Sequence, residues 1–224
     1  MSVYFRQILA GPMQNFVYAI GCERTRQCVL VDPAWAVDSL LDTLDADGMT
    51  LSGALITHYH PDHCGGSMFG LTVEGLPRLM ESRPVPVHVN EYEADGLKQV
   101  TGLSESDLVR QSSGNTLQVG DIELRFLHTP GHTPGSQCFL INDCLVSGDT
   151  LFIDGCGRVD LPGGDPEEMY RTLTQRLAKL PDQTILYPGH NYGNVPSSEM
   201  GTVKQTNHYM KVPTLEAWLS LMGR

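Results

Sequence analysis

Short apolar runs, each ended by glycine, proline or a polar loop, recur along the chain and predict mostly strands. Predominantly apolar stretches at residues 29–31, 54–56, 85–89 and 184–187 are too short for helices and are typical of buried strands. Residues 37–44 instead carry apolar side chains at helical spacing. A helix is therefore expected soon after the first of these strands.

Two tight hairpins are expected in the second half of the chain. In each, two strand-like runs are separated by a two-residue turn of the kind that favours antiparallel pairing. The paired arms and their turns are residues 117–119 and 122–127 around Gly120-Asp121, and residues 138–141 and 144–146 around Asn142-Asp143.

The clearest helix signal begins at Asp165. Its side chain can cap the helix, Pro166 suits the first helical position, and two glutamates follow where the helix dipole favours them. Pro181 ends this helix, and a second, short helix is expected at residues 214–222. The first helix carries one apolar stripe, made of Met169, Leu173, Leu177 and Leu180.

Strands in the first half, strands again after Leu117 and helices between them indicate the α+β class. The expected architecture is a four-layer αβ/βα sandwich, two sheets with helices outside. The length of 224 residues suits one domain spanning residues 1–224, with a short helical segment from about residue 196. The proline-containing segment 69–86 is interpreted as an ordinary surface connection, with a role in shaping the mouth of the site as the alternative.

Charge and cysteine content narrow the class of partner. The chain has 15 basic and 26 acidic residues and a formal net charge of -11, which argues against nucleic-acid or anionic-membrane binding. No signal peptide and no membrane span is recognised in the sequence, and the six cysteines show no CxxC spacing. We therefore expect a cytoplasmic protein with reduced thiols that acts on a small molecule. A homodimer is compatible with these features, since it is the commonest oligomer of soluble proteins.

Potential metal ligands are concentrated directly after the run at 54–56. His58, His60, Asp62 and His63 fall within six residues. In a strand, residues two apart share a face, so His58 and His60 could reach one ion, while Pro61 redirects Asp62 and His63 towards a second ion. Imidazole and carboxylate together suit zinc, iron or manganese more than calcium or magnesium.

Three further candidates follow apolar runs and come directly after glycine: His132, Asp149 and His190. Together with the first four they form a donor set for two ions, which in hydrolytic centres lie about 3.5–4 Å apart around an activated water. Asp62 and Asp149 are the candidate catalytic carboxylates. The remaining histidines, His88, His128 and His208, lack such settings and are interpreted as structural or surface residues.

These motifs resemble those of the metallo-β-lactamase superfamily. The residues that carry the resemblance are His58-x-His60-x-Asp62-His63, Thr129-Pro-Gly-His132, Gly148-Asp149-Thr150 and Pro188-Gly-His190. The resemblance implies the αβ/βα fold of that superfamily. It also implies a ligand set of His58, His60 and His132 for one metal, Asp62, His63 and His190 for the other, and Asp149 as the bridge.

The loop after Asp149 is similar to two groups within that superfamily. It resembles glyoxalase II-like hydrolases, which cleave glutathione thioesters, and also persulfide dioxygenases, which oxidise glutathione persulfide. In both groups Arg158 would lie near the carboxylates of a glutathione conjugate, and an arginine fork suits a carboxylate. Cys156 is the second candidate for substrate binding.

The resemblance implies a thioester hydrolase with two divalent ions, zinc or a mixed zinc and iron pair, whose bridging hydroxide attacks a carbonyl. The alternative is a dioxygenase with one Fe(II) held by His58, His132 and Asp149. Hydrolysis of another ester, lactone or acyl thioester is a further alternative. The ligand motifs alone do not separate these activities, because all of these groups retain them.

Overall fold

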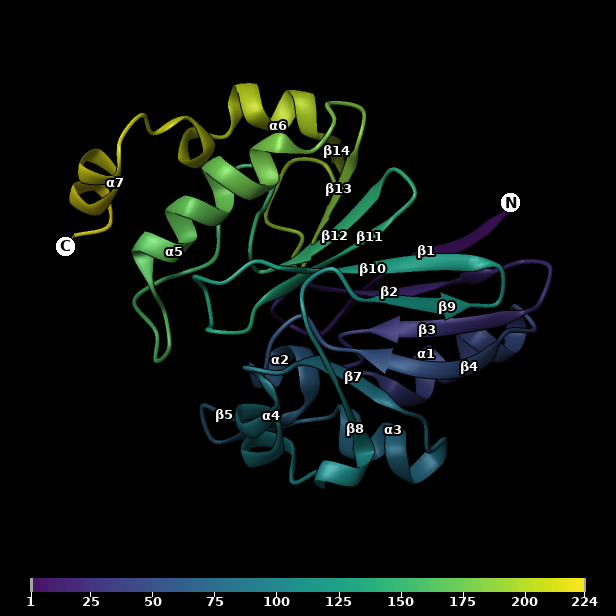
Figure 1. The fold of residues 1–224 in the computed structure, drawn as a ribbon. Coiled ribbons are helices and arrows are strands. Elements are labelled where there is room, and N and C mark those ends of the chain that lie inside the picture. Colours follow the sequence, from purple (N-terminus) through teal and green to yellow (C-terminus); the bar gives the residue numbers. More distant parts are fainter. Residues whose placement is uncertain (1, 224) are drawn as a thin grey trace.

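Two mixed sheets face each other, and helices cover both outer faces, in the computed structural model, which describes residues 2–223 (Figure 1). The α+β sandwich expected from the sequence is confirmed. The first sheet contains, in spatial order, β1 (Val3–Ala10), β2 (Asn15–Cys22), β3 (Gln27–Val31), β4 (Thr50–Leu55), β7 (Val87–Asn90) and β8 (Leu108–Gln111). The second contains β14 (Ser198–Glu199), β13 (Ile185–Pro188), β12 (Cys144–Gly148), β11 (Gln137–Ile141), β10 (Ile122–His128) and β9 (Thr116–Val119).

Each sheet has its own set of helices. Those packed on the first sheet are α1 (Val37–Ala46), α3 (Leu76–Ser82) and α4 (Ala94–Thr101). Those packed on the second are α5 (Pro166–Arg171), α6 (Met200–Thr206) and α7 (Leu215–Leu221). A one-turn helix, α2 (Pro61–Cys64), and a small hairpin, β5 (Gly66–Met68) with β6 (Leu71–Val73), follow β4.

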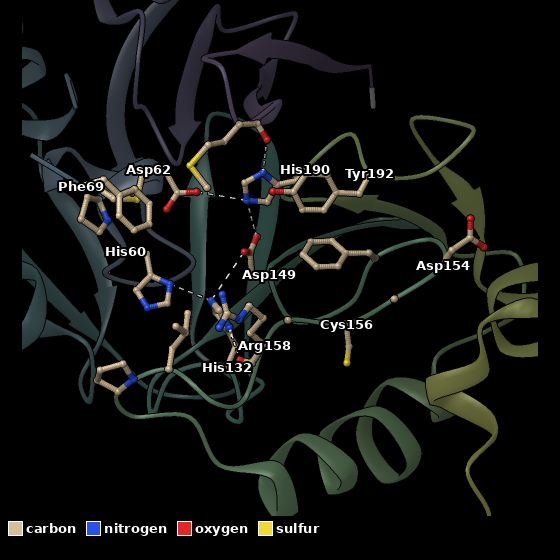
Figure 2. Close-up of a pocket in the computed structure, with 18 residues that line it drawn as sticks. His60, Asp62, Phe69, His132, Asp149, Asp154, Cys156, Arg158, His190 and Tyr192 are labelled. Atoms are coloured by element: carbon tan, nitrogen blue, oxygen red, sulfur yellow. Dashed lines mark hydrogen bonds and ion pairs between the residues drawn. The ribbon is translucent and has the colours of Figure 1, made fainter. Parts of the chain in front are cut away.

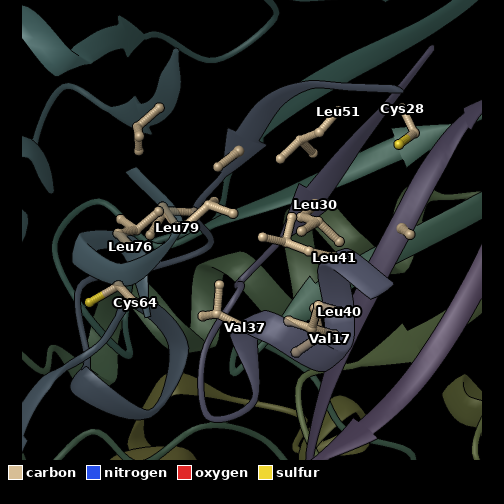
Figure 3. Packing of buried hydrophobic residues seen from close by; sticks show 14 of the residues in the cluster. Val17, Cys28, Leu30, Val37, Leu40, Leu41, Leu51, Cys64, Leu76 and Leu79 are labelled. Carbon is tan, nitrogen blue, oxygen red and sulfur yellow. The ribbon is translucent and has the colours of Figure 1, made fainter. Parts of the chain in front are cut away.

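The strand β2 explains how the two inner layers hold together. It is buried along its whole length, because alternate side chains enter different apolar clusters. Val17 and Ala19 pack with α1, whereas Phe16, Tyr18 and Ile20 face the second sheet. Figure 3 shows Val17 among the leucines of the α1 side. Burying each such large apolar side chain stabilises the fold by roughly 1.5–3 kcal/mol.

Strand direction brings the site loops to one edge. β10 and β12 both run antiparallel to β11, and β13 runs parallel to β12, so all three have their carboxyl ends at the same edge. The loop after β4 of the other sheet reaches the same edge, where the backbone N–H of Gln137 donates to the backbone carbonyl of Thr57 at 3.0 Å. Loops from both sheets therefore converge there.

The helix that begins at Asp165 has the expected cap and apolar stripe. The Asp165 carboxylate accepts from the amides of residues 167 and 168. The helix widens into a π-turn at Thr172–Arg176 and ends as a 3₁₀ turn at Leu177–Lys179. Met169, Leu173 and Leu177 are all buried. In an ordinary α-helix, which has about 3.6 residues per turn, side chains four residues apart point in successively rotated directions around the axis. The wider π-turn offsets this rotation and keeps the apolar side chains on one face.

Two segments differ from the expectation. The interpretation of residues 69–86 as an ordinary surface connection is wrong, because α3 buries Leu76 and Leu79 in the core. Phe69 lines a pocket, which agrees with the alternative that this segment shapes the mouth of the site. The N-terminal hairpin of β1 and β2 was not anticipated, because β2 lacks the alternation that marks a half-buried strand.

Within residues 2–223, no helix is both long and apolar enough to cross a membrane. The six cysteines are free thiols.

Candidate metal centre

Three imidazoles contributed by both sheets form a first cluster (Figure 2). His58 and His60 lie in the loop after β4, and His132 lies in the loop after β10. One ligand nitrogen of each lies within 4.8 Å of the others, and His60 Nδ1 is 2.9 Å from His132 Nε2. The expectation that His58 and His60 share a strand face is wrong, since β4 already ends at Leu55.

A carboxylate and two imidazoles form a second cluster. Asp62 and His63 lie on α2, where Pro61 occupies the first helical position, and His190 follows β13. His63 Nε2 and His190 Nε2 are 3.2 Å apart, and both lie within 3.4 Å of Asp62 Oδ2. The helical turn begun by Pro61 therefore separates this pair of donors from the two histidines before it.

Asp149 lies between the two clusters. Its Oδ1 is 3.3 Å from both His63 Nε2 and His190 Nε2, and its Oδ2 is 3.8 Å from His132 Nε2. One carboxylate thus faces both groups of histidines. All seven residues singled out in the sequence lie in one volume, in two adjacent groups joined by Asp149.

Hydrogen bonds outside the clusters fix the tautomers of four imidazoles. Each donates from Nδ1 to an acceptor, which leaves the lone pair on Nε2 and aims it into the site. The pairs are His58 with Thr57 Oγ1 (3.0 Å), His63 with Asp32 Oδ2 (2.9 Å), His132 with the Arg158 carbonyl (2.7 Å) and His190 with the Met13 carbonyl (2.9 Å).

The donor atoms fit metal ions better than they fit one another. His58 Nε2 is buried without a hydrogen-bond partner among the described residues. Asp149 Oδ1 is likewise buried without a hydrogen-bond partner within residues 2–223. Buried polar atoms rarely lack partners, so these two atoms, both directed into the site, are suited to metal ions.

The electrostatics also favour cations. Burial, reinforced by His132 and His63, lowers the pKa of His60 to about 4. The His60 imidazole is therefore uncharged at neutral pH and has a lone pair to offer a metal ion. Burial also opposes charge on His190, yet Asp149 and Asp62 raise its pKa to about 9. The second cluster therefore draws positive charge despite being buried.

Three of the seven candidate ligands follow a glycine, and at two of these glycines a side chain would not fit beside the site. A Cβ at Gly189 would lie 2.5 Å from Asp149 Oδ1, and one at Gly148 would lie 2.6 Å from the Thr57 side chain. Gly148 also has φ = +51°, in the left-handed region. Before Asp149 and His190, the Gly-ligand pattern thus reflects close backbone approach at the site.

Three supporting residues, Asp32, Asn15 and Glu93, were missed in the sequence. A carboxylate oxygen of Asp32 lies near the ring nitrogens of His58 and His63, so Asp32 could itself be taken for a metal ligand. Its oxygens instead accept hydrogen bonds from His63 Nδ1 and from the backbone amide and hydroxyl of Thr57. Asp32 therefore orients the loop that carries the candidate ligands. Asn15 donates to Asp62 Oδ2 and to the Asp62 carbonyl, both at 3.0 Å. A strand-ending carboxylate is the only signal that could have indicated Asp32.

Glu93, also missed, joins two ligand loops. This fully buried carboxylate accepts from the Tyr59 amide at 2.8 Å and from the Gly135 amide at 2.6 Å. It thereby ties the loop of His58 and His60 to the loop of His132. Burial raises the pKa of Glu93, and the hydrogen bonds it accepts oppose that shift.

We expect Glu93→Gln to weaken zinc binding about tenfold, in the range typical of residues that orient metal ligands. Glutamine offers one oxygen, so its amide group would face a backbone N–H and release one of the two loops. Competition with a chelator measures the affinity. Glu91→Gln, an exposed change two residues away, is the matched control, and equal affinity in both variants would contradict this role.

A pocket of about 560 Å³ opens over the two clusters. Arg158 lines it, and its guanidinium binds Asp160 through two contacts of 2.9 and 2.7 Å. Cys156 belongs to the wall, but its side chain packs against the core below the second sheet, and Figure 2 shows its sulfur pointing away from the histidines. Burial raises the pKa of Cys156 to about 12, so it serves as a small apolar wall residue.

The other histidines lie outside both clusters. His88 Nδ1 is 3.0 Å from the Gln111 side chain, and His128 donates to the Pro134 carbonyl at 2.9 Å. His208 is exposed in a 3₁₀ turn. Their interpretation as structural or surface residues agrees with these positions.

Comparisons with known proteins agree with the geometry. The family model described as "Metallo-beta-lactamase superfamily" matches residues 10–190. A probable polyketide biosynthesis zinc-dependent hydrolase, BaeB, of Bacillus velezensis is 29% identical, over 94% of this chain and 88% of its own length. A probable hydroxyacylglutathione hydrolase of Schizosaccharomyces pombe is 35% identical, over 81% of this chain and 66% of its own length.

The fold matches solved structures as well. The crystal structure of ETHE1 from Myxococcus xanthus superposes with a TM-score of 0.84 and is 31% identical. The match covers 99% of this chain and 90% of that chain. The similarity therefore includes the C-terminal helices as well as the segment that holds the ligands.

Proposed function

Because the chain belongs to the metallo-beta-lactamase superfamily, we propose that it is a metal-dependent hydrolase of acyl thioesters, of the glutathione type. The observation that carries this proposal is the pair of adjacent donor clusters joined by Asp149. A two-ion arrangement suits hydrolysis, since it can activate water and stabilise the charge that develops on the attacked carbonyl. The relatives named as zinc-dependent and hydroxyacylglutathione hydrolases support the same class of reaction.

The ligand residues divide between the two ions according to the clusters. His58, His60 and His132 would hold one, and Asp62, His63 and His190 would hold the other, with Asp149 shared. When bound, the ions would supply Lewis acidity and lower the pKa of water.

The remaining residues orient the ligands and the substrate. Asn15 holds the Asp62 carboxylate, and the Nδ1 hydrogen bonds keep the imidazole lone pairs directed into the site. In the pocket, Arg158 would face a carboxylate of the thiol part of the substrate, with Asp160 holding its guanidinium in a fixed orientation. Phe152 and Tyr192 form an apolar wall beside His190, with the Tyr192 ring stacked on His190 at 4.6 Å.

The similarity to ETHE1 and the loop around Arg158 favour a second candidate, oxidation of glutathione persulfide with one Fe(II). Only His58, His132 and Asp149 would then be needed as ligands. That candidate leaves Asp62, His63 and His190 as a buried donor cluster without a chemical role. Because both groups retain these residues, the second cluster is compatible with either candidate, and the relatives named as hydrolases are what favour the hydrolase.

The deciding experiment is metal analysis of protein purified from cells, with both reactions assayed in parallel. We expect about two ions per chain and loss of thioester absorbance when S-acylglutathione is added. One iron per chain, oxygen uptake with glutathione persulfide and no thioester turnover would overturn the hydrolase.

A further inference from the structure

The hairpin of β5 and β6 carries an unusual residue at its tip. Met68 pairs with Leu71, so Phe69 and Gly70 form a two-residue turn, with φ of +53° and +77°. Both values lie in the left-handed region, where glycine or asparagine is preferred and a bulky side chain is a rare occupant. The Phe69 side chain is also 91% exposed. A large apolar residue is thus presented to solvent in a strained backbone conformation.

The position of Phe69 relates this strain to the site. Phe69 and Met68 line the pocket over the two clusters. Figure 2 shows Phe69 beside Asp62 on one side of the ligands and Tyr192 beside His190 on the other. Strained residues concentrate where a site demands a particular side-chain position. The hairpin therefore supplies one wall of the pocket, opposite the wall of Phe152 and Tyr192.

The two walls differ in charge. The hairpin segment 66–73 contains no charged residue. The opposite loop contributes Asp154 and Arg158, and Arg158 is the one lysine or arginine that lines the pocket within residues 2–223. A thioester has two arms, a thiol carrier and an acyl group. A carrier with carboxylates suits the side of Arg158, which leaves the apolar hairpin for the acyl arm.

We propose that Met68 and Phe69 form a subsite for an apolar acyl chain, so that the enzyme prefers thioesters of unbranched, medium-length acyl groups over short hydroxyacyl groups. This inference rests on the proposed thioester hydrolysis. Burial of each methylene against Phe69 and Met68 would favour the longer substrate, partly offset because the pocket is open to solvent on one side.

A series of S-acylglutathiones from acetyl to octanoyl, with S-lactoylglutathione beside it, tests the preference. We expect kcat/KM to rise about twofold per methylene, which corresponds to half the free energy of full burial, and therefore about 60-fold from acetyl to octanoyl. Phe69→Ser should lower the octanoyl-to-acetyl ratio about tenfold, mainly through KM, whereas Phe69→Leu should restore most of it. A flat chain-length profile would overturn the subsite.

Leu71→Ser is the matched control. Leu71 lies on the same hairpin, is 64% exposed and is not among the residues that line the pocket. We expect its octanoyl-to-acetyl ratio to equal that of the unmodified enzyme. Equal losses in Leu71→Ser and Phe69→Ser would show that the hairpin matters only for folding, and would overturn the role of the Phe69 side chain.

A binding measurement separates failure of the subsite from failure of the proposed function. The thioethers S-octylglutathione and S-methylglutathione cannot be hydrolysed, so calorimetry with the metal-loaded protein reports the chain preference without turnover. We expect the octyl compound to bind at least about tenfold more tightly, and Phe69→Ser to remove most of that difference. If no thioester is hydrolysed but this preference holds, only the hydrolase is overturned. Equal affinities for the two thioethers overturn the subsite.

Discussion

We expect Asp149→Ala to lower the rate of thioester hydrolysis by about 100-fold or more and to reduce the metal content, while the fold remains intact. Asp149 is the carboxylate that faces both clusters, with Oδ1 at 3.3 Å from His63 and His190 and Oδ2 at 3.8 Å from His132. Alanine would remove the carboxylate proposed to be shared by both ions, together with its negative charge, which, against the effect of burial, raises the pKa of His190. Metal analysis and kcat/KM measure both effects.

The control for this variant is Asp143→Ala. Asp143 lies in the exposed turn before the same strand, β12, so its loss removes a carboxylate without touching the site. Circular dichroism and the urea midpoint verify that both variants fold. A folded Asp149→Ala variant with normal metal content and normal rate would refute the bridging role.

The second large effect is expected for Asp32→Asn, which should weaken zinc binding and lower activity by about 10- to 100-fold. Asp32 accepts three hydrogen bonds, from His63 Nδ1 at 2.9 Å and from the Thr57 amide and hydroxyl at 2.8 and 2.6 Å. Asparagine has one acceptor oxygen, so its NH₂ group would face a donor. His63 could relieve that conflict by moving its proton to Nε2, the nitrogen that faces the site.

Chelator competition measures the zinc affinity of this variant, and Asp42→Asn on the exposed face of α1 is the control. The change at Asp32 keeps the side-chain volume, so lost affinity would reflect hydrogen bonding rather than a cavity. If Asp32→Asn binds zinc as tightly as Asp42→Asn, the orientation of His63 does not depend on the Asp32 charge.

Much of the local structure follows from neighbouring residues in the sequence. The hairpin turns at 120–121 and 142–143, the cap at Asp165 and the helix at its predicted place all depend on residues within a few positions of one another. Such short-range preferences act before the chain is packed. For the same reason they could be predicted without knowing which sheet each element joins.

The candidate ligand residues were recognisable for a related reason. Four donor residues fall within six positions, and the other three each follow a glycine, so the types of residue and their setting were visible without coordinates. Their division into two clusters was not visible. Pro61 starts a helix rather than a bend at the end of a strand, and this turn is what separates His60 from His63.

The layered class, the local elements and the seven candidate donor residues could be inferred from the sequence. The folded chain was needed to show which carboxylates support the site and which residues line the pocket. Glu93 acts on Gly135, 42 residues away, and His190 donates to Met13, 177 residues away. Burial and hydrogen-bond partners at such separations arise only when distant strand ends meet at one edge. The local sequence around Glu93, Asp32 and Phe69 therefore does not distinguish them from ordinary surface residues.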